Sequence, residues 1–307
     1  MPDPAVRTER DHDEFIDTKL PFPMPKISVV VPVYKPQEEH LRAAVESILS
    51  QSFGDFELLM LDDCPQDRTA ETIIRSYGDS RIRYVRNSEN LGISASRNKL
   101  LEMAQGEYIA VMDHDDVSLP ERFARQAAYL DEHPSVGVTG CRVREIPSGK
   151  IAAWPVEDQA IRLALIRGCA IPHSAAMIRR SVLVENSIRY EERFFPAEDY
   201  ALWCRLLSCT QFHNLEEILF EYRLHPGNTS KLQVGKMNRA SYAIRAFLMA
   251  ENPALHLEFM QRASHVTRVR LFGVLPFLKI VRQYNRLTVN LFEMLPLFSC
   301  KSVSKVK

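Results

Sequence analysis

Three aspartates surround a histidine in the stretch GEYIAVMDHDDVSLPERF, residues 106–123, where Asp113, Asp115 and Asp116 follow an apolar segment. Burying carboxylates without partners costs several kcal/mol each, so we expect a positive group beside them. The spacing Asp113-x-Asp115 suits a divalent cation, because Mg²⁺ and Mn²⁺ prefer oxygen ligands, usually one or two carboxylates completed by phosphate oxygens and water. The alternative interpretation is an exposed acidic turn.

The spacing alone is a weak signal, because Asp11 and Asp13 repeat it near the N-terminus. No strand-like segment precedes that copy, and we interpret residues 1–25 as an acidic arm. The second copy follows a segment typical of a buried strand. This context favours a cation site at 113–115, with Mn²⁺ or Mg²⁺ as the expected cofactor.

Strand and helix patterns alternate around these acids. The run KISVVVPVY at 26–34 is continuously apolar and β-branched, as in a strand buried on both faces. Further strands are predicted at 56–63, 81–87, 108–113, 135–146, 175–183 and 217–225, and helices at 38–51, 67–77, 94–104, 118–133 and 198–209. This alternation predicts an α/β fold with a mostly parallel sheet covered by helices on both faces.

Polar side chains follow three of the predicted strands. Tyr34 ends the first strand, Asp62 and Asp63 end the second, and the aspartate cluster at 113–116 ends the fourth. Ligands of open parallel sheets bind at the carboxyl ends of the strands. We therefore expect these residues to share one edge and one binding site.

Several stretches together resemble glycosyltransferase family 2, whose members are inverting enzymes of the GT-A fold that use nucleotide sugars. They are ISVVVPVY, SILSQSFGDFELLMLDD, NSENLGISASRNKLLEMAQGEYIAVMDHDD, FFPAEDYALWCRLL and EYRLHPGNTS. Their order and spacing are more specific than any single motif. The resemblance implies a GT-A catalytic domain at 26–230, between the arm at 1–25 and a helical, basic C-terminal extension at 231–307.

The resemblance also implies a nucleotide site. Tyr34 would stack on the nucleobase, with Pro32 shaping the turn. Asp63 would accept a hydrogen bond from the base, Asp62 would support its loop, and Arg97 would lie near the diphosphate or the base edge. The family usually continues Asp-Asp with Gly-Ser, whereas this chain continues with Cys-Pro, which weakens the assignment of Asp63.

The metal and catalytic roles follow in the same way. Asp113 would hold the ribose and the metal, and Asp115 would be the principal metal ligand. His225 would complete the metal or diphosphate contacts. Asp199 would be the general base, with Glu198 beside it.

Structural roles remain open for several of these residues. Asp62 and Asp63 could stabilise the start of the following helix, as Glu198 and Asp199 could for theirs. We interpret Trp203 as a core residue rather than a sugar platform. In the aspartate cluster, His114 is expected to point away from the site, and the role of His173 is left open.

The composition is that of an ordinary globular protein: 307 residues, 46% hydrophobic and 25% charged. The six cysteines form no C-x-x-C pair, and the acidic N-terminus has no apolar segment typical of a signal peptide. We therefore expect a cytoplasmic protein. No internal repeat or membrane-spanning segment is expected.

From Gln261 to the C-terminus, nine Lys or Arg stand against one acid, Glu293. This basic, apolar-rich segment fits an amphipathic surface on an anionic membrane, at the inner face of the cytoplasmic membrane. Packing on the catalytic domain or an oligomer contact fits equally. No nucleic-acid-binding module accompanies the charge.

The preferred function is a metal-dependent inverting glycosyltransferase. It would move a sugar from a nucleotide-sugar donor to a glycan or glycolipid acceptor in bacterial surface polysaccharide synthesis, as lipopolysaccharide or capsule. The alternatives are a sugar-nucleotide nucleotidyltransferase, which would need a Gly-rich phosphate loop absent after the first strand, and a non-catalytic nucleotide-sugar binding protein.

Overall fold

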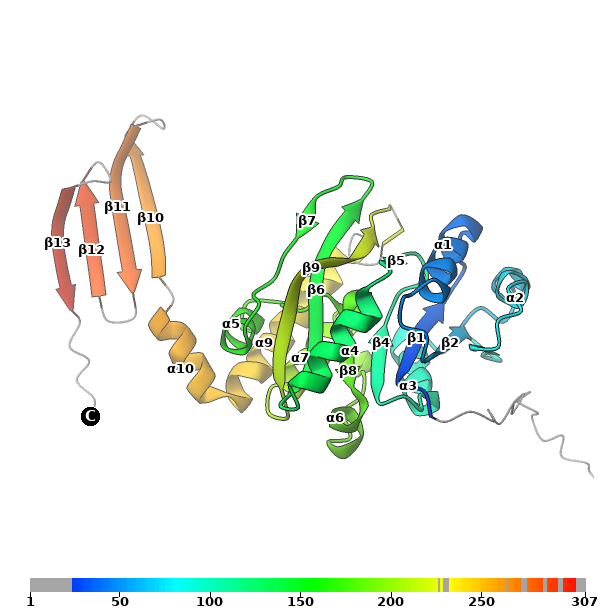
Figure 1. Ribbon diagram of the computed structural model, residues 1–307. Helices are drawn as coiled ribbons and strands as arrows, with labels where there is room; N and C mark the ends of the chain where they lie inside the picture. Colours follow the sequence, from blue (N-terminus) through cyan, green and yellow to red (C-terminus); the bar gives the residue numbers. More distant parts are fainter. Residues whose placement is uncertain are drawn as a thin grey trace, which may run out of the picture.

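The structure is a computed structural model that describes residues 24–225, 227–228 and 232–262, together with the backbone of strands between 264 and 301. Within these residues, nine strands form one large sheet (Figure 1), ordered β3-β2-β1-β4-β8-β6-β9-β5 with β7 paired to β6. The strands are β1 (Ile27–Val33), β2 (Phe56–Asp62), β3 (Ile82–Arg86), β4 (Tyr108–Val111), β5 (Val117–Ser118), β6 (Val136–Ile146), β7 (Ile151–Ala152), β8 (Met177–Arg179) and β9 (Gln211–Arg223).

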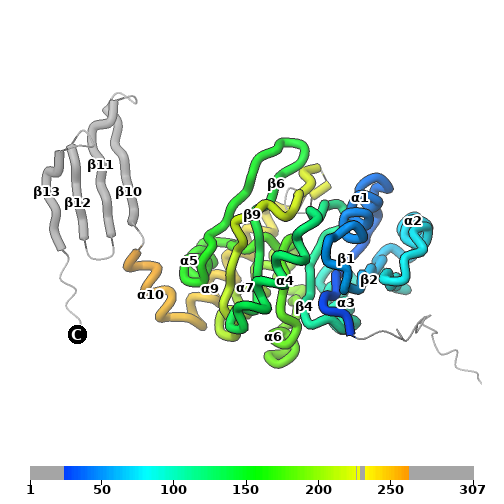
Figure 2. The backbone as a smooth tube through the Cα atoms, in the orientation of Figure 1, coloured from blue at the N-terminus to red at the C-terminus, as the bar shows by residue number. Residues whose placement is uncertain are grey.

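The first half of the sheet has the parallel order that the alternating pattern predicted. β1 pairs in parallel with β2 and β4, and β2 pairs in parallel with β3. Figure 2 shows β1 and β4 side by side although they are far apart in the sequence. β8 runs antiparallel to β4 and β6, whereas β6 and β9 are parallel. The α/β fold class with a mostly parallel sheet is confirmed.

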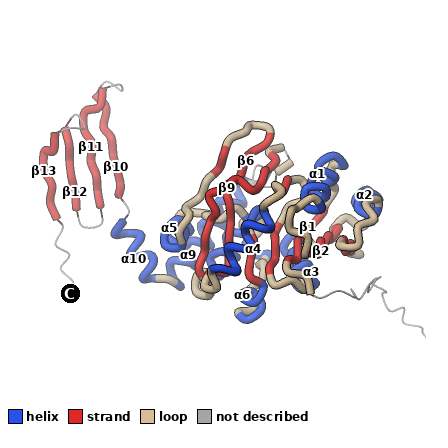
Figure 3. Tube along the Cα trace, viewed as in Figure 1, coloured by secondary structure: helices blue, strands red, loops and turns tan. Residues whose placement is uncertain are grey.

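Helices lie on both faces of the sheet (Figure 3), as predicted. Successive residues of a strand point to opposite faces, so β1 contributes Val29 and Val31 to one core and Val30 to the other. Helices α1, α2 and α4 pack on the first core, and α3, α5, α6 and α7 pack on the second. These helices are α1 (Glu38–Leu49), α2 (Thr69–Arg75), α3 (Ile93–Met103), α4 (Arg122–Glu132), α5 (Asp158–Leu165), α6 (Arg180–Glu185) and α7 (Glu198–Leu206), with short 3-10 helices η1 (His173–Ala175) and η2 (Glu192–Phe194).

Three predicted elements differ in their boundaries by four residues or more at one end. The strand predicted at 217–225 begins at Gln211, as β9. The strand predicted at 175–183 is limited to β8, because the chain turns into α6 at Arg180. The helix predicted at 118–133 begins only at Arg122, since Ser118 belongs to β5, where its hydroxyl accepts a hydrogen bond from Gln51.

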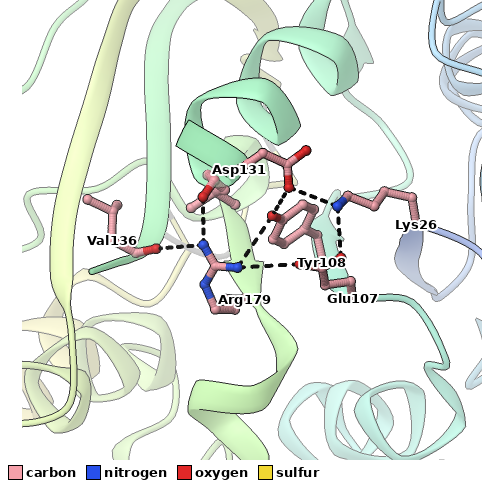
Figure 4. Close-up of polar contacts among 7 residues, drawn as sticks. Lys26, Glu107, Tyr108, Asp131, Val136 and Arg179 are labelled. Atoms are coloured by element: carbon pink, nitrogen blue, oxygen red, sulfur yellow. Dashed lines mark hydrogen bonds and ion pairs between the residues drawn. The ribbon is translucent and has the colours of Figure 1, made fainter. Parts of the chain in front are cut away.

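A polar network holds the amino-terminal ends of β1 and β4 (Figure 4). The Nζ atom of Lys26 lies 2.8 Å from carboxylate oxygens of both Glu107 and Asp131. The hydroxyl of Tyr108 donates to Asp131, and Arg179 donates to the backbone oxygen of Leu130 at the end of α4. Strands β1, β4 and β8 and helix α4 are thereby tied together at the sheet edge opposite the carboxyl ends of β1 and β4.

Gly106, between α3 and β4, allows the chain to pass directly over β1. A Cβ atom there would lie 2.5 Å from the backbone nitrogen of Ser28 and 2.7 Å from the carbonyl carbon of Ile27. Backbone atoms of a central strand cannot move aside easily. We expect Gly106→Ala to lower the free energy of unfolding by about 3 kcal/mol, as overpacking does, measured by urea denaturation. Gly54→Ala is the matched control, since its Cβ would meet nothing within 4 Å, and equal stability of the two variants would contradict the expectation.

The extension predicted as helical at 231–307 is only partly helical. Helices α9 (Val234–Glu251) and α10 (Pro253–Arg262) confirm the first part, and α9 buries Ile244 and Leu248 in the second core. This part of the extension therefore packs on the catalytic domain. No helix among the described residues combines the length and hydropathy that a membrane span requires.

The helical prediction is wrong for the backbone beyond α10. There, β10 (Ser264–Leu271), β11 (Leu275–Gln283), β12 (Arg286–Leu291) and β13 (Leu295–Lys301) form a four-stranded antiparallel sheet. Pro276 and Pro296 explain the error, because proline lacks the N–H that a helix interior needs. The frequent β-branched residues of this segment also favour strands.

This sheet contains a repeat that the sequence analysis missed. In the first hairpin, Arg270 pairs with Pro276 after a register shift, and in the second, Asn290 pairs with Pro296 after a register shift at the same place. Both hairpins carry the pattern Leu-Phe-x-x-Leu-Pro, starting at Leu271 and Leu291. The repeat is short and occurs only twice, which makes it easy to overlook. The acidic arm predicted at 1–25 lies almost wholly outside the described residues.

Candidate active site

A cavity of about 1100 Å³ opens at the carboxyl ends of β1, β2 and β4. Its wall also includes η1, the start of α7 and the end of β9. It is lined by nine of the ten predicted site residues: Pro32, Tyr34, Asp63, Arg97, Asp113, Asp115, Glu198, Asp199 and His225. The chain thus brings together residues from five separate stretches of sequence, as predicted.

The positive group expected beside the aspartates is Arg97 of α3. Its Nη2 atom donates to Asp113 at 3.1 Å, and its Nη1 atom donates to Glu198 at 2.7 Å. The second oxygen of Asp113 accepts a hydrogen bond from Ser174 at 2.6 Å. Burial by itself would raise the pKa of Asp113, but Arg97, together with His173 and Ser174, lowers it to about 2. Asp113 is therefore ionised at neutral pH.

Asp115 faces a different partner. One of its carboxylate oxygens lies 2.7 Å from Nε2 of His225, and its backbone oxygen accepts a hydrogen bond from the Arg223 side chain. The ring of His114 lies 3.2 Å from the backbone oxygen of Pro32 and lines the cavity, so the expectation that it points away is wrong.

Asp116 was not predicted as a site residue, and it is fully buried. Its carboxylate accepts a hydrogen bond from the backbone N–H of Arg223 at 2.8 Å. Burial, and after it the charges of Asp115 and Asp113, raises the pKa of Asp116 well above its ordinary value. Asp116 therefore fastens the end of β9 to the aspartate cluster instead of serving as a second open carboxylate. Its position directly after the Asp-x-Asp pair was the available signal.

At the carboxyl end of β2, Asp63 already has several donors. Its carboxylate accepts hydrogen bonds from Asn87 at 2.8 Å and from the backbone N–H groups of Leu91 and Gly92 at 2.9 Å each. A carboxylate offers about four acceptor positions, so a fourth donor can still bind. The contact of Asp63 with a nucleobase stays a prediction.

Asp62 does not line the cavity. It is fully buried, and it accepts hydrogen bonds from the backbone N–H of Cys64 and from the Tyr84 hydroxyl. This is the loop-supporting arrangement that was anticipated for it. Tyr34 is 46% exposed at the cavity wall, and the Lys35 ammonium lies over its ring, 5.2 Å from the ring centre. Its stacking on a nucleobase stays a prediction.

Glu198 and Asp199 begin α7 on the opposite wall. Glu198 is buried against Arg97, whereas Asp199 accepts a hydrogen bond at 2.7 Å from the backbone N–H of Tyr200. Burial, and after it the charge of Glu198, raises the pKa of Asp199 to about 6. A carboxylate with this pKa is ionised at neutral pH yet basic enough to accept a proton, which suits a general base.

Three residues next to the start of α7, His173, Ser174 and Tyr190, were not assigned roles from the sequence. Nε2 of His173 lies 2.8 Å from the Tyr190 hydroxyl, and Ser174, next in the chain, holds Asp113. Burial, followed by the charge of Arg97, lowers the pKa of His173 to about 3, so its imidazole is neutral. Trp203 lies fully buried in the second core, which confirms its interpretation as a core residue.

The residues of the cavity can be compared with what a divalent cation needs. Among the described residues, no group of three or more His, Cys, Asp or Glu side chains is placed to hold a metal by itself. Both oxygens of Asp113 are engaged by Arg97 and Ser174, whereas Asp115 and His225 contact one another through Nε2 of His225. A cation that replaced the proton between them would therefore have Asp115 and His225 as donors. One carboxylate and one imidazole fit a Mn²⁺ or Mg²⁺ ion that completes its coordination with phosphate oxygens and water.

An acid-lined cavity at the strand ends of an α/β domain, holding a carboxylate of raised pKa, has the features of an enzyme active site. Residues 28–185 match Glycosyl transferase family 2. The chain belongs to this family and is a glycosyltransferase.

Two relatives from Escherichia coli illustrate the similarity. The O-antigen biosynthesis glycosyltransferase WbnJ is 28% identical over 231 residues, covering 72% of this chain and 89% of WbnJ. The UDP-Glc:alpha-D-GlcNAc-diphosphoundecaprenol beta-1,3-glucosyltransferase WfaP is 27% identical over 227 residues, covering 73% of this chain and 87% of WfaP.

Among solved structures, S. aureus TarS in complex with UDP-GlcNAc superposes with a TM-score of 0.63 at 21% identity, covering 77% of this chain and 72% of that chain. At this identity the likeness bears on the fold. It confirms the GT-A fold that the sequence resemblance implied.

Proposed function

We propose that this protein is a metal-dependent inverting glycosyltransferase that moves a sugar from a nucleotide-sugar donor to a saccharide or lipid-linked saccharide acceptor in bacterial surface polysaccharide synthesis. The observation that carries the proposal is the placement of two acidic groups in one cavity. Asp115 with His225 provides cation-binding donors, and Asp199 provides a separate carboxylate with a pKa of about 6. A metal-dependent inverting transfer uses both.

In the proposed reaction, an acceptor hydroxyl attacks the anomeric carbon while the nucleoside diphosphate leaves from the opposite face. Asp199 accepts the hydroxyl proton as the bond to the anomeric carbon forms. A positioned general base typically contributes about 10²- to 10⁴-fold to the rate. The carbon–oxygen bond to the diphosphate breaks in the same step, and its electron pair leaves with the diphosphate.

Asp115 and His225 would hold Mn²⁺ or Mg²⁺ in this site. The ion, when bound, would neutralise negative charge on the diphosphate. The protein's own contribution on this wall is orientation, because Asp116 and Arg223 fasten the aspartate cluster to the end of β9.

The substrate classes have separate support. TarS is crystallised with UDP-GlcNAc, and the name of WfaP describes a UDP-Glc donor and a diphosphoundecaprenol-linked acceptor. A polyprenyl-linked acceptor would place this enzyme at the cytoplasmic face of a membrane. The basic composition of the segment from Gln261 onward suits contact with anionic lipid there.

The pH dependence tests the assignment of the base. Because burial and the charge of Glu198 raise the pKa of Asp199 to about 6, kcat/KM should fall about tenfold per pH unit below that value, as Asp199 becomes protonated. A profile flat from pH 7 to pH 5 would contradict the assignment. Besides burial, the charges that shift the pKa of Asp199 are those of Glu198, Arg97 and Asp113. Burial, and in addition the charge of Asp199, raises the pKa values of Tyr190, Cys169 and Cys204.

The function itself is tested by incubating the protein with a panel of UDP-, GDP-, dTDP- and CMP-sugars and measuring release of the nucleotide, with and without Mn²⁺. Transfer to a saccharide acceptor with inverted anomeric configuration supports the proposal. Formation of a sugar nucleotide with pyrophosphate release would instead identify a nucleotidyltransferase. Saturable donor binding without turnover across acceptors would indicate a non-catalytic binding protein.

A further inference from the structure

Arg97 joins the two walls of the cavity. It is 7% exposed, and its two terminal nitrogens are both used in ion pairs, one with Asp113 on the metal side and one with Glu198 on the base side. Its Nε atom is buried and finds no hydrogen-bond partner among the described residues. This arrangement differs from the resemblance, which placed Arg97 beside the diphosphate or the base edge.

The guanidinium is held from behind by a closed set of contacts. It lies 5.5 Å from the ring centre of Tyr190, whose backbone N–H and C=O both bond to the amide of Asn98, the next residue along α3. The Tyr190 hydroxyl meets His173, and the neighbouring Ser174 returns to Asp113. A side chain enclosed in this way has little freedom to reorient toward a ligand.

Glu198 depends on Arg97 more than Asp113 does. Glu198 is 6% exposed, its Oε1 atom accepts from Arg97, and its Oε2 atom has no hydrogen-bond partner among the described residues. Asp113 keeps Ser174 as a second donor. Without Arg97, Glu198 would be a buried carboxylate with no compensating charge beside Asp199, and such groups protonate or move toward water.

We propose that Arg97 is a positioning residue that holds Asp113 and Glu198 in fixed relation and thereby sets the place of Asp199 at the start of α7, rather than a residue that binds the nucleotide. This inference rests on the proposed function, because it names Asp199 as the base. It assigns to one buried side chain the coupling between the wall that carries Asp113 and the wall that carries Glu198 and Asp199.

The test compares wild type with Arg97→Met, Glu198→Gln and the double variant. In Arg97→Met we expect kcat to fall about 100-fold, within the range that misplacement of a base costs, while the donor Kd measured by calorimetry stays close to wild type. The acid limb of the kcat profile should move to higher pH, because Arg97 lowers the pKa of Asp199. In the double variant, both the acid limb of the kcat profile and the melting temperature should return toward wild type, because the unpaired carboxylate of Glu198 has been replaced by a neutral amide.

Arg142→Met is the matched control, since it removes an exposed Arg–Glu pair between β6 and β9 whose two residues do not line the cavity. A large loss of donor affinity in Arg97→Met, with kcat and its pH profile unchanged, would overturn the inference and restore the nucleotide-binding role. The inference would also be overturned if the melting temperature of the double variant fell by the sum of the decreases in Arg97→Met and Glu198→Gln. The melting cycle needs no turnover, so it is informative even if wild type proves inactive and the proposed function fails.

Discussion

Replacing Asp199 by asparagine is expected to lower kcat by about 10²- to 10⁴-fold, because an amide cannot accept the proton of the acceptor hydroxyl. The change keeps the size of the side chain and its carbonyl oxygen, which can still accept the hydrogen bond from Tyr200. Donor binding, which depends on the opposite wall, should stay close to that of wild type. The measurements are kcat from release of the nucleoside diphosphate and donor Kd from calorimetry.

Asp67→Asn provides a matched control for this change. Asp67 also accepts a backbone N–H at the start of a helix, in this case that of Thr69, but it does not line the cavity. Its variant should retain wild-type turnover. Full turnover in Asp199→Asn would remove Asp199 from the mechanism and would leave Glu198 as the remaining carboxylate at the start of α7.

Replacing Asp115 by asparagine is expected to abolish most of the metal-dependent part of donor affinity. A neutral amide loses the charge that attracts the cation, and it also weakens the contact with His225 at 2.7 Å. Even residues that only support a metal ligand typically cost about 10- to 100-fold in affinity or activity, so we expect a loss of about 100-fold or more. Calorimetric titration of the donor with and without Mn²⁺ measures it.

A second variant, His225→Gln, helps to separate metal binding from folding. It should weaken the metal-dependent affinity in the same direction, although less, because the carboxylate remains. Melting temperatures of both variants without metal should stay near that of wild type, since Asp115 and His225 lie at the cavity wall. Unchanged stimulation of donor binding by Mn²⁺ in Asp115→Asn would contradict this assignment of the cation site.

The aspartates of the cavity were predicted from their place at the ends of strands. The second Asp-x-Asp pair was distinguished from Asp11 and Asp13 by the strand before it, and the structure places that pair at the end of β4. The departure from the family at Cys64 and Pro65 is accommodated, since Asp62 accepts the Cys64 N–H. Most of the hydrogen-bond acceptor positions of the Asp63 carboxylate are nevertheless occupied by donors of the protein itself, which the motif did not indicate.

The C-terminal segment shows where local patterns fail. Basic and apolar residues were interpreted as helical to the end of the chain, but only α9 and α10 are helices. Pro276 and Pro296 were the available evidence against a helix, because proline is unfavourable in a helix interior. They are twenty residues apart and occupy the same position in their respective hairpins. Period alone does not separate strand from helix in short apolar runs.

For residues 26–113, the order of strands and helices could be predicted from the sequence, and so could the edge at which the acids gather, because the carboxyl ends of neighbouring parallel strands point the same way. The partners of the buried charges could not be predicted in this way. Arg97 meets Glu198 across 101 positions of the chain, and Asp115 meets His225 across 110. Such pairs depend on how helices pack on the sheet, and no local pattern records which buried charge will compensate another.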